Sequence, residues 1–394
     1  MKPMEISDGV YEVGAIDWNV RDFHGYSTKQ GSTYNSYLII DDKITLIDAV
    51  KAEFAEELLN NIGKIVDPKK IDFVISNHTE MDHSGGLAKV MHRVGEGKPL
   101  LCSKMGQKNL SKHFRHKWNY RPVENGEKLN LGKRSLTFIE TRMLHWPDSM
   151  FTYLNEDKIL FSSDAFGQHF AGLKRYDDLI GDEIMPHAKK YFANILLLYS
   201  PLILKLLESV DQMGLEIRMI CPDHGIIWRK DPLKIIKAYE EWSLQKPKRK
   251  AVLVYDTMWH STEIMAEAIA KSLDREGVEA LPMHLRASHR SDIITEVLDA
   301  GAVVVGSPTL NNGLFPTVMD FLSYMKGLKP QNKIGAAFGS YGWSGESVKM
   351  IISELEAMKF DIIGPGLKVQ YVPDDNAISS CHELGRLISK KLPG

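Results

Sequence analysis

Residues 71–86 read IDFVISNHTEMDHSGG, an apolar stretch of strand length followed by a polar one that contains His78, Glu80, Asp82 and His83. The apolar part predicts a buried strand, and the Ser-Gly-Gly at the end lets the chain turn. His78, Glu80 and Asp82 alternate at period two, which in an extended segment places their side chains on one side. Imidazole and carboxylate groups are the ligands that divalent iron, zinc and manganese prefer. The segment therefore predicts a metal site beyond a strand.

Further candidate ligands follow apolar runs elsewhere in the first half of the chain. His145 lies in TRMLHWPDSM, Asp164 in LFSSDAFG and His224 in ICPDHG. Strand ends that lead into loops are where a fold presents functional groups. The set is large enough for two ions, with Asp164 as the natural bridging carboxylate. The predicted ligands are His78, Glu80, Asp82, His83, His145, Asp164 and His224.

The first half consists mainly of strand-type runs with helices between them. Predicted strands are YEVGAIDW, YNSYLII, KITLIDAV, IDFVIS, PLLCS, SLTFIET, FTYLN, KILFSSD and RMICPDHG, and predicted helices are AEFAEELLNNIGKIV and a stretch from about Pro186 to Met213. This order fits a sandwich of sheets covered by helices. We expect one domain over residues 1–246.

The segment QKPKRK (245–250) is basic and contains proline, and we interpret it as a solvated linker between two domains. After it, five predicted strands alternate with five predicted helices, beginning with AVLVYD and ending with AISSCHELGRLISKKL. Strict alternation of this kind indicates a doubly wound parallel sheet. We expect this second domain to cover residues 250–394.

Three loops of the second domain follow predicted strands. TMWHST (257–262) opens a helix, and GSPTLNNG (306–313) and GSYGWSGES (339–347) end later strands. Doubly wound sheets bind ligands at the carboxyl ends of their strands, and a helix N-terminus attracts anions. Tyr341 and Trp343 add aromatic faces among glycines. The chain has no GxGxxG motif, which argues against a dinucleotide fold.

Composition excludes several classes of protein. Among 394 residues, 43% are hydrophobic and 25% charged, which are ordinary globular values. The net charge of −2 gives no argument for nucleic acid or an anionic membrane. The three cysteines form no CxxC pair, no apolar run approaches the roughly 20 residues of a membrane helix, and the N-terminus lacks an export signal. We expect a cytoplasmic protein whose metal ligands are nitrogen and oxygen.

The motifs HxExDHxGG, HWPDS, a strand-end Asp and PDHG resemble the metallo-β-lactamase fold as used in flavodiiron proteins, and the likeness extends over the whole chain because a flavodoxin-like domain follows. The implied fold is an αββα sandwich followed by a doubly wound sheet. Hydrolases of this fold usually have histidine where this sequence has Glu80, and they bind two zinc ions. A carboxylate adds negative charge and a hard oxygen donor, which stabilises ferric iron. The resemblance therefore implies a non-haem diiron centre.

The resemblance also assigns roles to single residues. Family members differ in whether the residue at His83 binds iron directly. His24 and Tyr191 are implied as groups next to the metal site that take part in catalysis. The hydroxyls of TMWHST match those that hold the FMN phosphate in flavodoxins. The implied flavin-binding residues are Thr257, Met258, Trp259, His260, Ser261, Thr262, Ser307, Pro308, Thr309, Asn311, Asn312, Ser340, Tyr341, Gly342, Trp343, Ser344 and Gly345.

The implied activity is reduction of O2 to water, of NO to N2O, or of both. FMN and a diiron pair together hold four electrons, the number that full reduction of O2 requires. Implied partners are a separate electron donor, either a rubredoxin or a flavin reductase, and a second copy of the chain in a head-to-tail homodimer or a dimer of dimers. The main alternative is a dinuclear zinc hydrolase with a flavodoxin-like redox appendage, and a third is an electron carrier with a degenerate metal domain.

Overall fold

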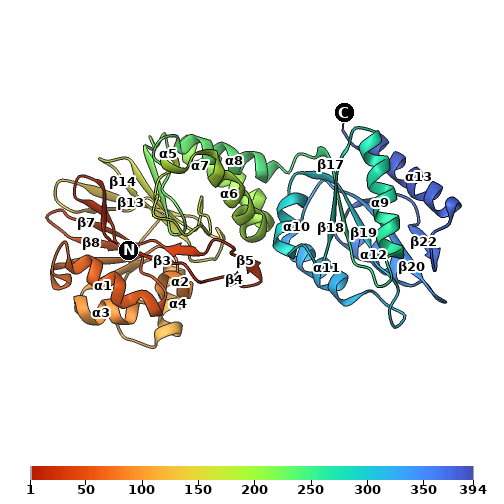
Figure 1. Ribbon diagram of the computed structural model, residues 1–394. Helices are drawn as coiled ribbons and strands as arrows, with labels where there is room; N and C mark the ends of the chain where they lie inside the picture. Colours follow the sequence, from red (N-terminus) through yellow and green to blue (C-terminus); the bar gives the residue numbers. More distant parts are fainter. Residues whose placement is uncertain (1, 394) are drawn as a thin grey trace. The chain divides into compact units, whose positions relative to one another are not determined.

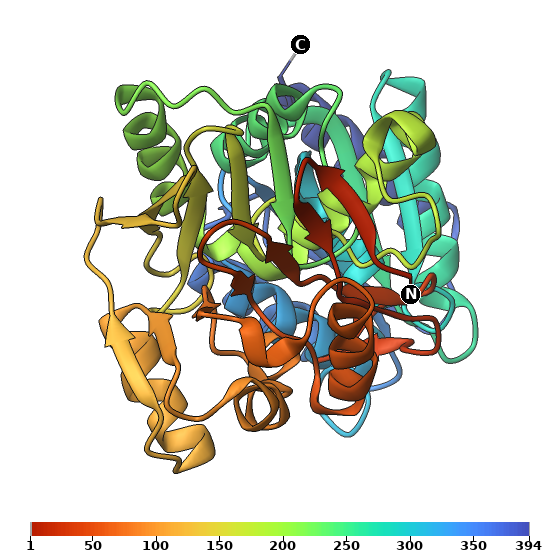
Figure 2. The same cartoon turned by 90° about the vertical axis from the view of Figure 1, so that its left-hand side faces the viewer.

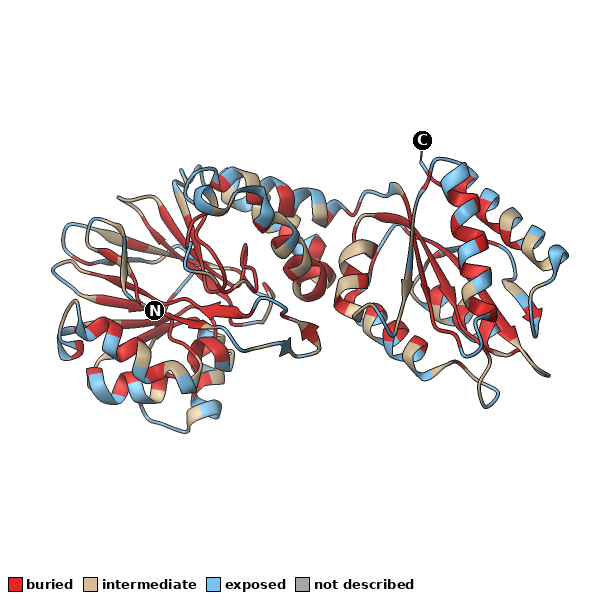
Figure 3. Cartoon of the chain, in the orientation of Figure 1, coloured by how far each residue is buried: buried red, intermediate tan, exposed pale blue. Residues whose placement is uncertain are grey.

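A computed structural model of the chain describes residues 2–393, which form two compact units. The first unit consists of Met1–His24, Thr28–Tyr191 and Pro201–Glu240, and the second consists of Gly25–Ser27, Phe192–Ser200 and Glu241–Gly394. The central strands of both units are buried, whereas the outer faces of the helices are exposed (Figure 3). Each unit is described below by itself.

The first unit contains a seven-stranded sheet in the order β1-β2-β7-β8-β9-β10-β11 and a five-stranded sheet in the order β12-β13-β14-β15-β16. The strands of the first sheet are β1 (Met4–Ser7), β2 (Val10–Glu12), β7 (Tyr37–Ile39), β8 (Thr45–Ile47), β9 (Phe73–Ser76), β10 (Pro99–Cys102) and β11 (Asn119–Pro122). Those of the second are β12 (Lys128–Asn130), β13 (Ser135–Glu140), β14 (Met150–Leu154), β15 (Ile159–Ser163) and β16 (Met219–Pro222). Outside these two sheets, β3 (Ala15–Asp17) pairs with β6 (Ser32–Tyr34), and β4 (Asp22–Phe23) pairs with β5 (Tyr26–Ser27).

Helices cover both outer faces of the two sheets, so the unit is the predicted αββα sandwich (Figures 1 and 2). On one side lie α1 (Ala55–Gly63), α2 (Met81–Ser84), α3 (Leu87–Val94) and α4 (Lys104–Phe114). On the other lie α5 (Asp177–Ile180), α6 (Met185–Tyr191), α7 (Ser200–Gln212) and α8 (Pro232–Leu244). Helices α2, α3, α4, α5 and α8 were not predicted, because they are short or have weakly apolar faces.

The central strands of the first sheet, such as β8 and β9, are apolar on both faces because both faces are buried. In β9, Val74 packs toward the helices and Ile75 packs toward the second sheet. Leu46 and Ile47 in β8 divide in the same way. Successive side chains of a strand point to opposite faces, so runs such as FVIS suit a sheet between two layers. These rigid strands end where the candidate ligands begin.

The second unit contains a parallel sheet in the order β18-β17-β19-β20-β21, with β22 pairing β20. Its strands are β17 (Lys248–Tyr255), β18 (Glu279–His284), β19 (Ala300–Gly306), β20 (Ile334–Tyr341), β21 (Asp361–Ile362) and β22 (Leu367–Gln370). Its helices are α9 (Ser261–Arg275), α10 (Arg290–Val297), α11 (Pro316–Leu328), α12 (Ser347–Ala357) and α13 (Asp375–Lys391). The five predicted helices are present, and the short strand β21 was not predicted.

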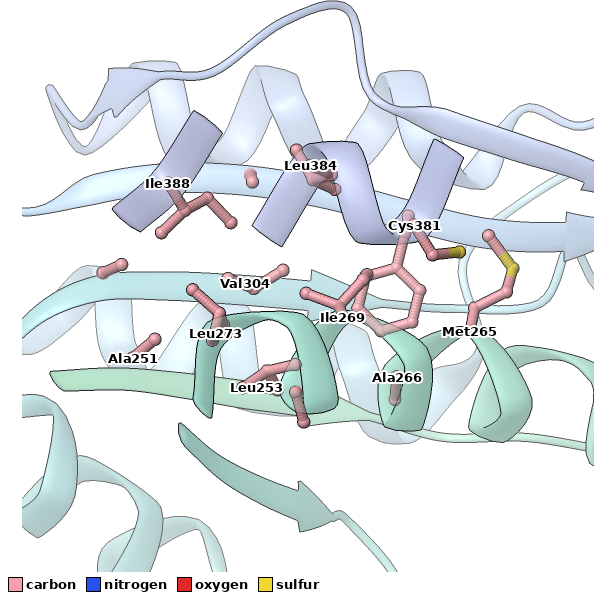
Figure 4. Packing of buried hydrophobic residues seen from close by; sticks show 14 of the residues in the cluster. Ala251, Leu253, Met265, Ala266, Ile269, Leu273, Val304, Cys381, Leu384 and Ile388 are labelled. Atoms are coloured by element: carbon pink, nitrogen blue, oxygen red, sulfur yellow. The ribbon is translucent and has the colours of Figure 1, made fainter. Parts of the chain in front are cut away.

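Helices α9 and α13 pack together on one face of this sheet (Figure 4). Ile269 and Leu273 of α9 meet Leu384 and Ile388 of α13 above Val304 of β19. The spacing of four residues within each helix places both members of each pair on one side. The amphipathic pattern of these helices is therefore explained by packing on the sheet.

The interpretation of QKPKRK as a solvated linker was wrong at both ends, because Gln245 is only 2% exposed and the last three residues already belong to a strand. β17 begins at Lys248, and Lys250 is only 4% exposed. Its ammonium group pairs with Glu296 and lies 3.1 Å from Asp299. A lysine can enter a sheet when carboxylates compensate its charge, which a composition argument does not detect. The domain boundary at 246–250 stays a prediction.

The helical stretch 177–212 is long and apolar enough to cross a membrane by length and composition alone, and 33% of its most apolar window is buried. By itself this is weak evidence, because core helices of soluble proteins pass the same test.

A buried ion pair joins distant parts of the first unit. Arg175 pairs with Glu12 in the interior and also donates a hydrogen bond of 2.7 Å to Asn35 Oδ1. The Asn35 amide donates in turn to the carbonyl oxygens of Pro222 at 2.7 Å and Gly225 at 3.1 Å. This network therefore anchors the loop that carries His224.

We expect Arg175→Met to lower the free energy of unfolding of the first unit by about 3–5 kcal/mol, because it leaves the Glu12 carboxylate buried without its partner. Denaturant unfolding followed by far-UV circular dichroism measures this loss. The double variant Glu12→Met/Arg175→Met removes both charges and should recover most of it. An unchanged midpoint for the single variant would contradict the assigned role of the pair.

Candidate functional site

The predicted ligands gather in the first unit as two groups. His78, Glu80, His145 and Asp164 form the first group, and Asp82, His83 and His224 form the second. Within each group the potential ligand atoms lie within 4.8 Å of one another. The sequence carries them on the segments that follow β9, β15 and β16, and on the turn between β13 and β14. The fold thus brings together all seven residues that the sequence analysis selected.

The carboxylate of Asp164 lies between the two groups. Its Oδ2 is 3.3 Å from Nε2 of His78 and 3.3 Å from Nε2 of His145. Its Oδ1 is 3.1 Å from Nε2 of His83 and 3.5 Å from Nε2 of His224. One oxygen therefore faces each group, which is the arrangement that a carboxylate bridging two ions requires.

The expectation that His78, Glu80 and Asp82 share one side of an extended segment was wrong. Extended backbone ends at Glu80, with φ −61° and ψ 147°, and α2 begins at the next residue. Asp82 and His83 therefore lie on a helical turn and belong to the second group. Gly85 permits this turn, because a Cβ there would lie 2.3 Å from the carbonyl oxygen of Met81.

Buried carboxylates and imidazoles share charge in this site. Burial opposes ionisation of Asp164, but His83 and His145 hold its pKa well below the usual range. Burial likewise disfavours protonation of His78, but its hydrogen bonds with Asp148 and Glu80 raise its pKa to about 10. Without a metal ion, the protonated imidazoles thus compensate the negative charge of the carboxylates. A divalent cation would supply the same charge and displace these protons.

Unpaired polar atoms also fit a cation here. Among residues 2–393, Asp82 Oδ1 and Asp164 Oδ2 are buried and accept no well-aligned hydrogen bond, although two imidazole nitrogens lie 3.3 Å from Asp164 Oδ2. A buried acceptor that lacks a partner costs about 1–3 kcal/mol, so such atoms usually indicate an ion or water. With only nitrogen and oxygen donors, the site suits iron, zinc or manganese.

The residues predicted next to the metal site both contact it. Nε2 of His24 lies 3.4 Å from Glu80 Oε1, and most of the His24 side chain is exposed. The hydroxyl of Tyr191 donates to Asp164 Oδ1 at 2.8 Å. Burial and the neighbouring Asp164 raise the pKa of Tyr191 well above its usual value, so the phenol keeps its proton.

The sequence analysis missed several buried polar residues around the ligands. His169 lies 2.7 Å from Ser32 Oγ through Nδ1, and its ring centroid is 4.7 Å from that of His224. Asp148 and Asp223 contact ligand imidazoles, at 3.1 Å from His78 and 3.6 Å from His83. Both aspartates stand in quoted motifs, HWPDS and PDHG, so their position next to a ligand was the available signal.

The second unit contains a cavity of about 460 Å³ at the carboxyl ends of its strands. Predicted flavin-binding residues that line it are Met258, Trp259, Ser261, Pro308, Thr309, Asn311, Asn312, Ser340, Tyr341, Gly342, Trp343 and Ser344. Leu310, Tyr371 and Val372 also line it and were missed. Thr257, His260, Thr262, Ser307 and Gly345 are not among the lining residues. Its size and apolar, aromatic walls are typical of a site for a planar ring.

Predicted residues behind the cavity wall support its loops. Thr262 Oγ1 and Ser340 Oγ lie 2.9 Å apart and join the first loop to the third. His260 has φ +66°, a backbone conformation that favours glycine. Thr257 Oγ1 is buried and has no partner among the described residues. Together with the start of α9, this hydroxyl fits a phosphate group.

Comparison with known proteins agrees with both halves of this description. The model of the ODP family beta lactamase matches residues 33–225, and the flavodoxin model matches residues 253–385. A nitric oxide reductase of Moorella thermoacetica is 48% identical over 99% of each chain. These matches confirm the predicted fold classes.

Two solved structures are similar over nearly the whole chain. The rubredoxin oxygen:oxidoreductase of Desulfovibrio gigas is 45% identical and has a TM-score of 0.97, with 99% of this chain and 98% of that chain covered. The flavodiiron protein of Giardia intestinalis is 37% identical and has a TM-score of 0.95, with coverages of 99% and 96%. These names favour an oxidoreductase over the zinc hydrolase alternative.

We expect Trp343→Ala to weaken FMN binding by roughly 10- to 100-fold, the loss typical of one aromatic stacking contact. The Trp343 ring is 85% exposed at the cavity, so it has little packing to lose in the chain alone. Fluorescence titration of flavin-free protein with FMN measures the affinity. Trp18→Ala, which removes a half-exposed ring of the first unit, is the matched control, and equal affinities for all three proteins would exclude Trp343 from the flavin site.

Proposed function

This chain belongs to the flavodiiron protein family, and on that basis we propose that it reduces O2 to water, NO to N2O, or both, at a non-haem diiron centre served by FMN. The observation that carries the proposal is the Asp164 carboxylate, with one oxygen facing each of two ligand groups. The family supplies the identity of the ions and of the flavin.

We assign one iron to the first group and one to the second, with Asp164 shared. His83 counts as a direct ligand in this proposal, because its Nε2 lies among the donors of the second group, 3.3 Å from Asp82 Oδ2. Bound iron would supply one-electron redox chemistry and a position for the gas. Glu80 contributes a hard, charged oxygen in place of the histidine of zinc hydrolases, which favours iron.

Tyr191 and His24 are proposed to act on protons near the substrate. The Tyr191 hydroxyl donates to Asp164 Oδ1 at an oxygen–oxygen distance of 2.8 Å and orients that carboxylate. His24 places an exposed imidazole beside Glu80, so it can exchange protons with solvent at the edge of the site. The buried Tyr191 is therefore proposed to position the Asp164 carboxylate, and the exposed His24 is proposed to transfer protons.

The function is tested on protein purified without oxygen and analysed for metal and flavin. We expect two irons and one FMN per chain, and consumption of O2 or NO by the chemically reduced protein. Asp164→Ala should lose bound iron and gas consumption but keep FMN. Two zinc ions per chain, with iron unable to restore gas consumption, would contradict the proposal and favour a hydrolase.

Electrons are proposed to come from a rubredoxin or a flavin reductase in the cytoplasm, since one relative is named as a rubredoxin oxygen:oxidoreductase. We further propose a head-to-tail homodimer or a dimer of such dimers, in which the FMN of one chain serves the irons of its partner. The exposed rings of Trp259 and Trp343 at the flavin cavity support an apolar contact there.

Sedimentation of the protein with its cofactors should give at least twice the 44.5 kDa mass of one chain. Gas consumption per chain should fall on dilution below the dissociation constant of the dimer, because separated chains lose the partner's flavin. A monomer that keeps full activity would rule out this arrangement.

A further inference from the structure

Asp148 lies in HWPDS, two residues before β14, and its buried carboxylate contacts a ligand of the first group. Its Oδ2 lies 3.1 Å from Nδ1 of His78, the ring nitrogen that faces away from Asp164. The other ring nitrogen, Nε2, is 3.3 Å from Asp164 Oδ2. His78 is therefore held between two carboxylates, one on each side of its ring.

Three donors fix the carboxylate of Asp148 in this position. The backbone N–H and the hydroxyl of Thr79 each donate to Oδ2 at 2.8 Å. The Asn109 amide donates to Oδ1 at 3.1 Å and to the Thr79 hydroxyl at 3.2 Å. The hydroxyl of Ser103, the N-cap of α4, donates to the Asp148 carbonyl at 2.8 Å. Both carboxylate oxygens of Asp148 thus accept hydrogen bonds, which hold the carboxylate in one orientation.

We propose that Asp148 is a positioning residue, which keeps the proton of His78 on Nδ1 and directs Nε2 toward the metal ion of the first group. The inference rests on the proposed function, since it requires a metal ion there. A carboxylate that accepts from the remote nitrogen of a ligand imidazole fixes its tautomer and raises its basicity as a ligand.

The histidines of the second group lack such a carboxylate partner, so the positioning effect of Asp148 should be confined to the first group. Nδ1 of His224 donates to the carbonyl oxygen of Thr33 at 2.6 Å, a neutral acceptor. Nδ1 of His83 has no hydrogen bond within residues 2–393, and Asp223 is 3.6 Å away, too far for one. Only His78 among these three has a carboxylate hydrogen-bonded behind it. Loss of Asp148 should therefore affect one of the two ions selectively.

The test uses the full chain with FMN bound, stripped of metal and titrated with Co²⁺ against a competing chelator. The original protein should bind two Co²⁺ ions. In Asp148→Asn we expect one binding step to weaken by about 10- to 100-fold, the usual effect of losing such a partner, and the other to stay unchanged. The visible absorption of Co²⁺ in the weakened site should change as well, because the imidazole is no longer held in one orientation.

Two backgrounds identify the affected ion. In Asp82→Ala, which damages the second group, adding Asp148→Asn should weaken the remaining Co²⁺ by the same factor. In His145→Ala, which damages the first group, the added substitution should leave the remaining ion unaffected. Thr79→Val removes one donor to Asp148 without changing side-chain size much, and it should weaken the same step by a smaller factor.

Unchanged affinities and spectra in Asp148→Asn would overturn the inference. Equal weakening of both steps would overturn it too, because it would indicate a general structural role. Asp182→Asn, which changes an exposed carboxylate, provides the control for loss of charge. If the original protein binds fewer than two Co²⁺ ions, the dinuclear site itself is wrong, and the proposed function fails with it.

Discussion

The first unit depends on the compensation of buried negative charge. Asp82 and Asp164 lie in the interior, and Glu80 is only slightly exposed. An isolated carboxylate in such surroundings is so unfavourable that it would take up a proton. The imidazoles of His78, His83 and His145, whose pKa values the neighbouring carboxylates raise, or metal ions in place of their protons make ionisation of the carboxylates favourable instead. Cation binding is therefore favoured by the buried negative charge of the site, independently of the reaction that the cations support.

The sandwich meets this requirement because its strands end at the site. β9 belongs to one sheet, whereas β15 and β16 belong to the other, and ligands follow all three. Strands packed on both faces move little, so short loops after them hold side chains in defined positions. The buried pair of Glu12 and Arg175 extends this rigidity to the loop of His224 through Asn35. The strands and the buried ion pair thus fix the positions of the ligands, whereas the imidazoles and metal ions compensate the charge of the carboxylates.

The sequence predicted those features that depend on local pattern. Alternation predicted the doubly wound sheet of the second domain, and the ligand-rich segment at 77–86, together with polar residues at three other strand ends, predicted the residues that meet at the site. Features that depend on distant contacts were missed. The helical turn at Asp82 requires the space left by Gly85, Lys250 enters β17 because Glu296 and Asp299 are nearby, and Tyr371 reaches the cavity only through the pairing of β22 with β20. None of these contacts leaves a periodic signal in the sequence.

The two candidate sites differ in polarity and in exposure to solvent. The metal site is closed and polar, and every ligand except Glu80 and His145 is buried, because ions need donors and little solvent. The flavin cavity instead exposes Trp259 and Trp343 by 86% and 85%. Two exposed rings beside one cavity form an apolar surface that suits a planar ligand or another apolar surface. The exposed rings at one site and the buried charges at the other are therefore both stabilised by binding a cofactor. The flavin covers the rings, and the metal ions compensate the charges.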